Sequence, residues 1–367
     1  MAEPGLFSDT EARFLRALTD EGVEFLVVGL SAAALQGAPA VTQDIDLWFR
    51  DLTDPGIKKA LRRVGGVYVS PTGSTPPMFV GPAVALFDVV VSMHGLESFA
   101  KEAARAVIVV LDGYWPDPTL AADPRVHIIH RGKAAGMRPA INAATAIAKG
   151  DFLMKLDAHC MVAEGFDVAL AAECADDWIV VPRRYPLDPE AWCIQPSTKP
   201  PIDYHYLSYP LASEAPLTGL HGSPWRERGK GREDVLLDDE MSSQGSCWFM
   251  SRKHWDRLGP MEIDKYGNFI QEFQELGLKT WLGGGAVKVN KRTWYAHLHK
   301  GKTHGRGYFI SKQEMDAGAD FAMRYWTLDR WAERRRDLRW LIEKFAPVPT
   351  WPADLDAAFA RAREVFA

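Results

Sequence analysis

The sequence lacks several features that would place the protein in a membrane or outside the cell. No apolar run approaches the roughly 20 residues that span a bilayer, so we expect no membrane partner. The first residues, MAEPGLFSDTEARF, lack the basic and apolar blocks of a signal peptide. Its four cysteines (Cys160, Cys174, Cys193 and Cys247) form no C-x-x-C pair. We therefore expect reduced thiols and a cytoplasmic location.

The sequence also lacks a strong charge of either sign, internal repeats and low-complexity tracts. A formal net charge of -5 over 367 residues gives no whole-chain argument for binding nucleic acid, although it leaves room for a local basic patch. Hydrophobic residues make up 47% and charged residues 25%, which is typical of a globular protein. The length allows two or three domains with a substantial core.

The first of three zones, residues 1–105, alternates helix and strand signals. Ser8 and Glu11 have the spacing of a capping box, which predicts the start of a helix. Short β-prone runs predict strands at 25–28, 45–49 and 83–91.

Three acids lie in the predicted strands of this zone. Asp44 and Asp46 are two residues apart, so their side chains project from the same face of a strand. Asp88 lies in a later apolar strand, where a lone carboxylate would need a partner. Three convergent acids suit Mg²⁺ and phosphoryl transfer. The alternative is that the acids lie at exposed strand ends.

The second zone has the alternation of an α/β domain. Apolar runs predict strands at 107–113, 126–129, 152–157 and 178–185, with a helix at 137–149. Strand–helix alternation favours a mostly parallel sheet covered by helices. From about residue 311 the chain is predicted to be helical and rich in arginine. We therefore predict domains at 1–105, 106–310 and 311–367.

A candidate metal site follows one of these strands. Asp157 and His159 stand at the carboxyl end of the strand, where open α/β sheets bind ligands. One carboxylate and one imidazole can hold Mn²⁺ or Mg²⁺ against a diphosphate. Later, His297 and His299 flank Leu298 and share a strand face, with His304 nearby. The alternative is that these strand-end residues are simply solvated.

The order of these motifs resembles GT-A glycosyltransferases of the family 2 kind. It runs from VVLDG through R-x-x-x-N (Arg138 to Asn142) and GDFL to D-A-H-C, which resembles the polypeptide N-acetylgalactosaminyltransferases. The resemblance implies a nucleotide-diphosphate sugar donor, with Asp112 on its base or ribose and Arg138 and Asp157 on the donor side. It also implies a metal bound by Asp157 and His159, with His297 or His299 as the third ligand.

A second motif resembles the acceptor side of the same enzymes. The run QEFQELGLKTWLGGG contains the matching positions Glu272, Glu275, Lys279, Trp281, Gly283 and Gly284. The resemblance implies that Glu272 faces the acceptor, with Glu275 and Trp281 beside it. A carboxylate there can take or orient the hydroxyl proton. The alternative is an ordinary amphipathic helix with exposed acids.

The first zone resembles the minimal nucleotidyltransferase superfamily. Gly29 and Ser31 match its phosphate-holding turn, and Asp44, Asp46 and Asp88 match its metal ligands. Leu30 departs from the turn, and the downstream half of that fold is missing, so we expect weak or absent nucleotidyl transfer. The GT-A region in turn lacks its usual first strand. The strand near 87–92 could replace it by lying beside 107–111.

The C-terminal part of the sequence bears on which molecule accepts the sugar. Residues 291–346 mix arginines and lysines with aromatics, a composition that can hold phosphates and stack on bases. This tail resembles phage-type sugar transferases that modify hydroxymethylated DNA bases, which implies a DNA acceptor and, for a phage-encoded chain, the host cytoplasm. The alternatives are an amphipathic helix packed on the core, a nucleotidyltransferase, or an inactive scaffold that binds nucleic acid or a protein.

Overall fold

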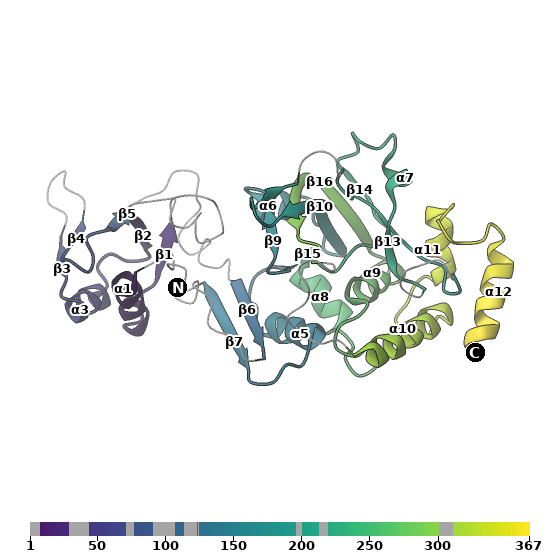
Figure 1. Ribbon diagram of the computed structural model, residues 1–367, viewed down its shortest axis with the longest axis horizontal. Helices are drawn as coiled ribbons and strands as arrows, with labels where there is room; N and C mark the ends of the chain where they lie inside the picture. Colours follow the sequence, from purple (N-terminus) through teal and green to yellow (C-terminus); the bar gives the residue numbers. More distant parts are fainter. Residues whose placement is uncertain are drawn as a thin grey trace. The chain divides into compact units, whose positions relative to one another are not determined.

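The computed structural model describes residues 8–28, 44–70, 77–90, 107–113, 123, 125–195, 200–212, 219–300 and 311–367. The chain divides into two compact units, whose elements are labelled in Figure 1. The first contains Met1–Ala134 and Ile147–Gly150, and the second contains Ala135–Ala146 and Asp151–Ala367. The predicted phosphate turn with Gly29 and Ser31 lies outside the described residues, as does His304.

The first unit begins with the predicted helix. Its elements are α1 (Asp9–Asp20), β1 (Phe25–Val28), β2 (Ile45–Phe49), α3 (Pro55–Arg63), β3 (Val67–Val69), β4 (Met78–Val80) and β5 (Phe87–Val90). The capping box is present, because the Ser8 hydroxyl accepts from the Glu11 amide and the Glu11 carboxylate accepts from the Ser8 amide. This satisfies amides that the first helical turn leaves without partners.

A small sheet and two helices enclose the core of this part of the chain. The strand β2 is antiparallel to β1 and parallel to β5. Phe14 of α1 packs edge-to-face on Phe79 and Phe87, with ring centroids 5.5 and 5.0 Å apart. The strand predicted at 83–91 begins only at Phe87, because residues 82–86 form a turn.

The same unit contains a separate parallel pair, β6 (Val107–Asp112) and β7 (Val126–Arg131). Among the described residues, β5 pairs with β2 and β6 pairs with β7. The expectation that 87–92 would lie beside 107–111 in one sheet is therefore wrong for the described strands. Each of the two strands finds its backbone partners elsewhere.

The second unit is built on a mixed sheet of seven strands. Its elements are α5 (Met137–Ile147), β8 (Phe152–Leu156), β9 (Cys160–Val162), α6 (Phe166–Ala172), β10 (Trp178–Asp188), β11 (Cys193–Ile194), β12 (His205–Leu207), β13 (Gly222–Pro224), α7 (Arg226–Gly229), β14 (Leu237–Asp239), β15 (Cys247–Ser251), α8 (Arg252–Leu258), α9 (Glu272–Leu282), β16 (Ala286–His297), α10 (Lys312–Thr327), α11 (Leu338–Phe345) and α12 (Leu355–Phe366). The sheet order is β14-β16-β10-β15-β8, and β9 adds to β16 and β11 to β10. Among the described strands of this sheet, β10 and β16 pair in parallel and the other pairs are antiparallel.

Helices cover this sheet and bury much of the tryptophan content. In Figure 1, α8 and α9 lie on one side of the strands and α6 lies on the other. Trp248 of β15, Trp281 of α9 and Trp326 of α10 are at most 2% exposed. The predicted α/β class with a helical C-terminal part is confirmed. The expectation of a mostly parallel sheet is wrong for the seven-stranded sheet, whose described strands pair mainly antiparallel. No helix among the described residues has the length and apolarity to cross a membrane.

Candidate functional site

Two neighbouring strand ends bring the predicted metal ligands together. The strand β8 ends at Leu156, and the amide of Asp157 then donates to the carbonyl oxygen of Ser246 at 2.9 Å. The chain turns into β9, which pairs antiparallel with the end of β16 so that Cys160 stands opposite His297. This register brings His159 and His297 next to each other and to the Asp157 carboxylate.

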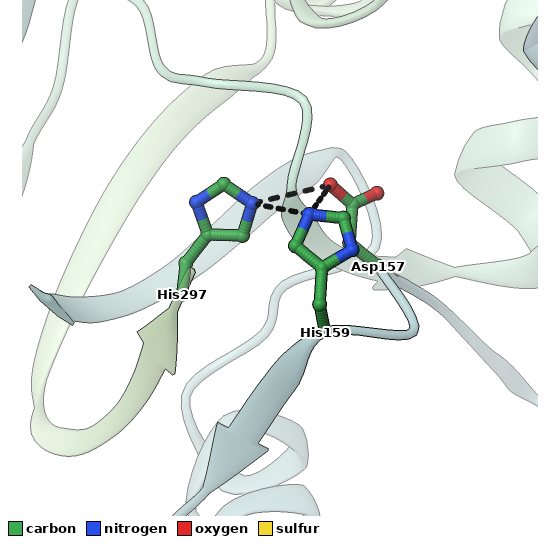
Figure 2. A group of neighbouring side chains, drawn as sticks. All are labelled: Asp157, His159 and His297. Carbon is green, nitrogen blue, oxygen red and sulfur yellow. Dashed lines mark hydrogen bonds and ion pairs between the residues drawn. The ribbon is translucent and has the colours of Figure 1, made fainter. Parts of the chain in front are cut away.

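The three side chains converge on one point, as Figure 2 shows. Asp157 Oδ2 lies 3.3 Å from His297 Nε2 and 3.7 Å from His159 Nε2, and the two nitrogens are 3.1 Å apart. Ligands at right angles around a divalent cation, with bonds of about 2.1 Å, stand about 3 Å apart. The donor set therefore fits a divalent metal ion, with positions left for other ligands.

The protonation states also suit a metal. Burial lowers the pKa of His159 to about 4, so its imidazole is neutral near pH 7 and keeps a lone pair. Burial alone would raise the pKa of Asp157, but the hydrogen bond with His297 and the charge of Lys155 hold it below its usual value. An ionised carboxylate and a neutral imidazole are the forms that bind metals.

A lysine and a tryptophan that sequence reasoning missed connect this site to Glu272. Lys155 Nζ lies 2.5 Å from Asp157 Oδ1 and 3.3 Å from Glu272 Oε2. The indole of Trp248 donates to Glu272 Oε1 at 2.7 Å. Lys155 could have been found, because it precedes Asp157 by two in a strand and so shares its face. Trp248 carried no such signal.

Glu272 is the first residue of α9 and is 4% exposed. Gln271 before it has a φ of 52°, the left-handed conformation, which turns the chain sharply into the helix. Burial raises the pKa of Glu272, while Lys155 and Trp248 oppose that shift. Lys155 contacts both this carboxylate and Asp157, and so connects Glu272 to the candidate metal ligands.

The other acceptor-side positions are inside the protein. Glu275 is 1% exposed and pairs with Arg138 at 2.5 Å and with Lys279 at 2.7 Å. Trp281 donates its indole N–H to the carbonyl oxygen of Glu240 at 3.1 Å and packs on Phe345. Through these contacts, both side chains stabilise the position of α9.

Arg138, predicted on the donor side, is also inside the protein. Its side chain is fully buried and bonds to the Glu275 carboxylate and to the carbonyl oxygens of Glu262, Ile270 and Gln271. Four of the five guanidinium N–H groups are used in this way. These hydrogen bonds hold in place the segment before α9, the helix that begins with Glu272.

The remaining predicted residues lie at separate places. Asp112 ends β6 and pairs with Arg131 at 3.4 Å. His299 stacks edge-on against His297, with centroids 5.0 Å apart, but offers no ligand atom to the Asp157 group. In the first unit, Asp44, Asp46 and Asp88 bring their oxygens within 4.8 Å of one another. Burial and the two neighbouring acids raise the pKa of Asp46.

A cavity of about 350 Å³ opens next to His297, where β10 and β16 end. Leu187, Ile202 and Leu298 give it apolar walls, and Gln195, Arg226 and His299 add polar groups. Among the residues that the structure describes, no carboxylate lines it. The cavity is therefore suited to a neutral or anionic molecule beside the three convergent side chains.

The aromatic residues of the C-terminal part belong to the core. Trp326 and Trp331 are buried, and the Trp326 indole donates to the Tyr266 hydroxyl at 2.7 Å. Trp340 lies beneath the guanidinium of Arg336 at 4.1 Å. Arg339 pairs with Glu343 at 2.7 Å and also with Asp356. Trp326 and Trp331 are therefore packed inside the protein and are not available to stack on a base.

Among known proteins, a family model matches part of the chain. Residues 99–258 match the family model described as Glycosyl transferase family 2, a span that contains Asp112, Asp157 and His159. No curated protein matches the chain significantly. A solved structure described as GalNAc-T7 with UDP, GalNAc and Mn²⁺ matches at 13% identity and a TM-score of 0.46. The match covers 67% of this chain and 51% of that one, so the chain spans about half the length of that protein. Residues 99–258, somewhat less than half of the chain, are thus similar to glycosyl transferases of family 2.

Proposed function

We propose that the protein transfers a sugar from a nucleotide-diphosphate donor to a hydroxyl group, with the reaction centred on Asp157, His159 and His297. The observation that carries the proposal is the convergence of these side chains within the unit that includes most of the matched domain. The site also adjoins a cavity of about 350 Å³ that could admit an acceptor.

The donor set favours Mn²⁺ over Mg²⁺. Two imidazoles and one carboxylate suit a transition metal, whereas Mg²⁺ prefers oxygen ligands. A bound cation would supply positive charge to the departing diphosphate. The protein's own part is to hold an ionised Asp157 and a neutral His159 in place, since burial keeps the pKa of His159 at about 4.

On the acceptor side, we assign Glu272 the placement of the reacting hydroxyl. Its two oxygens are held by Lys155 and Trp248, which fixes the orientation of the carboxylate. A positioned carboxylate of this kind can accept or orient a proton during transfer. The cavity beside His297 has room for an acceptor with an apolar face, because Leu187, Ile202 and Leu298 line it.

A panel of nucleotide sugars tests this function. The protein is incubated with each donor and Mn²⁺, Mg²⁺ or a chelator, and release of nucleoside diphosphate is measured by chromatography. Release that requires Mn²⁺ supports the proposal. Absence of release with every donor and candidate acceptor would contradict it.

A hydroxymethylated DNA base is the finer acceptor proposal. Its support is the sequence resemblance together with exposed arginines such as Arg334 and Arg335 near α11. The buried tryptophans of this region do not add to that support. The acceptor would then have to be recognised by phosphate contacts and by the cavity beside His297.

The first unit supports a second candidate function, nucleotidyl transfer. Asp46 and Asp88 stand opposite each other on the parallel strands β2 and β5, and Asp44 completes the group. Three carboxylates within 4.8 Å can share a divalent cation. Adding nucleoside triphosphates to the same panel tests this, since incorporation that is lost in Asp46→Asn would promote this candidate.

A further inference from the structure

The side chain of Lys155 stands between the two carboxylates of the candidate site. It is 12% exposed, and its ammonium contacts Asp157 Oδ1 at 2.5 Å and Glu272 Oε2 at 3.3 Å. It also donates to the carbonyl oxygen of Gly245. An ammonium group has three N–H donors and no acceptor. These three oxygens therefore account for its whole hydrogen-bonding capacity.

This saturation separates Lys155 from a substrate-binding lysine. A lysine that binds a phosphate must direct at least one N–H toward it. In Lys155, each N–H has a protein acceptor. Asp157 Oδ1 is held by the lysine, and Oδ2 is thereby left facing His159 and His297. The lysine thus sets which oxygen of Asp157 points into the metal site.

The ammonium of Lys155 also lies close to the buried carboxylate of Glu272. Glu272 is 4% exposed, and an ionised carboxylate at such depth needs a compensating charge. Its other oxygen receives the neutral indole N–H of Trp248. Glu275, three residues along α9, has its own partners in Arg138 and Lys279. Lys155 is therefore the compensating charge for Glu272.

We propose that Lys155 is a positioning residue that joins the metal-side carboxylate of Asp157 to the acceptor-side carboxylate of Glu272, so that the two act as one unit. The inference rests on the proposed sugar transfer for its kinetic meaning. The structural coupling that it describes can also be measured without any substrate.

A double-mutant cycle tests the proposal. Glu272→Gln should lower kcat by about 10²–10⁴-fold with donor affinity unchanged, the range for a positioned acid–base group. Lys155→Met should lower kcat to a similar extent, because Glu272 loses its counter-charge. Residues that act as a unit are not additive, so the double variant should be no slower than the slower single variant. A loss in the double variant equal to the product of the two single losses would overturn the proposal.

Lys288 offers a matched control. Its ammonium lies 2.6 Å from Asp239, it is 19% exposed, and it precedes His297 by nine residues on β16. Whatever the loss of kcat in Lys288→Met, the loss in a variant that combines it with Glu272→Gln should equal the product of the two single losses. Lys155→Arg, which keeps the charge, should retain more activity than Lys155→Met. Equal losses in the Arg and Met variants would count against a role for the charge.

If Lys155→Met folds too poorly for kinetic measurements, the melting temperatures of the variants test the same coupling. Removing one partner of a buried ion pair destabilises a protein more than neutralising both. The double variant should therefore melt at a higher temperature than Lys155→Met alone, and an equal or lower melting temperature would refute the coupling. This readout uses no donor, so failure of the wild-type protein to transfer sugar would refute the proposed function and leave this test intact.

Discussion

The Nε2 atoms of His159 and His297 lie 3.1 Å apart although 138 residues separate the two histidines in the sequence. Antiparallel pairing of β9 with the end of β16 creates this proximity. A shift of the pairing by one residue would turn His297 to the other face of the sheet. The candidate metal site therefore depends on the fold of the whole second unit.

Replacing Arg138 tests whether it supports the fold or binds the donor. In Arg138→Met, Glu275 loses the partner at 2.5 Å and three backbone carbonyls lose their donor. Breaking a buried pair costs about 3–5 kcal/mol, so the free energy of unfolding in urea should fall by that order. Arg361→Met, which removes an exposed pair with Glu364, should change it by less than about 0.5 kcal/mol. Unchanged stability of Arg138→Met with lost donor affinity would instead favour the donor-side role.

The buried His254 is expected to make the folded protein less stable at acidic pH. Burial and the nearby Arg257 lower the pKa of His254 to about 3, below the value of about 6.5 in the unfolded chain. The unfolded state therefore binds the extra proton first, and the contribution of His254 to stability is complete above about pH 6.5 and is lost as the pH falls toward 3.

The variant His254→Gln isolates this contribution. Glutamine can keep a hydrogen bond to Thr280, which His254 contacts at 2.8 Å, but it does not titrate. Between pH 6 and pH 4 the unfolding free energy of the wild type should fall more steeply than that of the variant, by up to about 1.4 kcal/mol per pH unit. Parallel curves for the two proteins would show that His254 is not the group responsible.

The DNA proposal predicts binding to duplex DNA that weakens steeply with salt. Each phosphate contact adds about 0.9 to the slope of log affinity against log salt. Arg334→Gln and Arg335→Gln, which change exposed side chains, should each lower the slope by about one unit if the residue contacts a phosphate. Arg361→Gln on α12 is the control, because its guanidinium already pairs with Glu364. No binding at low salt would favour a protein, glycan or small-molecule acceptor.

Local patterns predicted the elements better than they predicted the site. The capping box at Ser8 and the strand that precedes Asp157 were correct because helix caps and strand periodicity act over a few residues. The burial of Arg138 and Trp281 was not visible in the sequence, since it depends on partners more than 40 residues away. Likewise, the sequence placed His297 and His299 on one strand face but could not decide between them, because the register of β9 on β16 decides which one reaches Asp157.

The central claim is that Asp157, His159 and His297 form one metal site, and calorimetric titration with Mn²⁺ tests it most directly. The wild-type protein should bind the ion, and Asp157→Ala and His297→Ala should each weaken binding by more than about 10-fold, since loss of outer-shell partners alone costs 10–100-fold at metal sites. His299→Ala, two residues along the chain, should leave the affinity unchanged because the three converging side chains are Asp157, His159 and His297. Wild-type affinity in a folded Asp157→Ala variant, or a loss in His299→Ala that equals the loss in His297→Ala, would contradict the account.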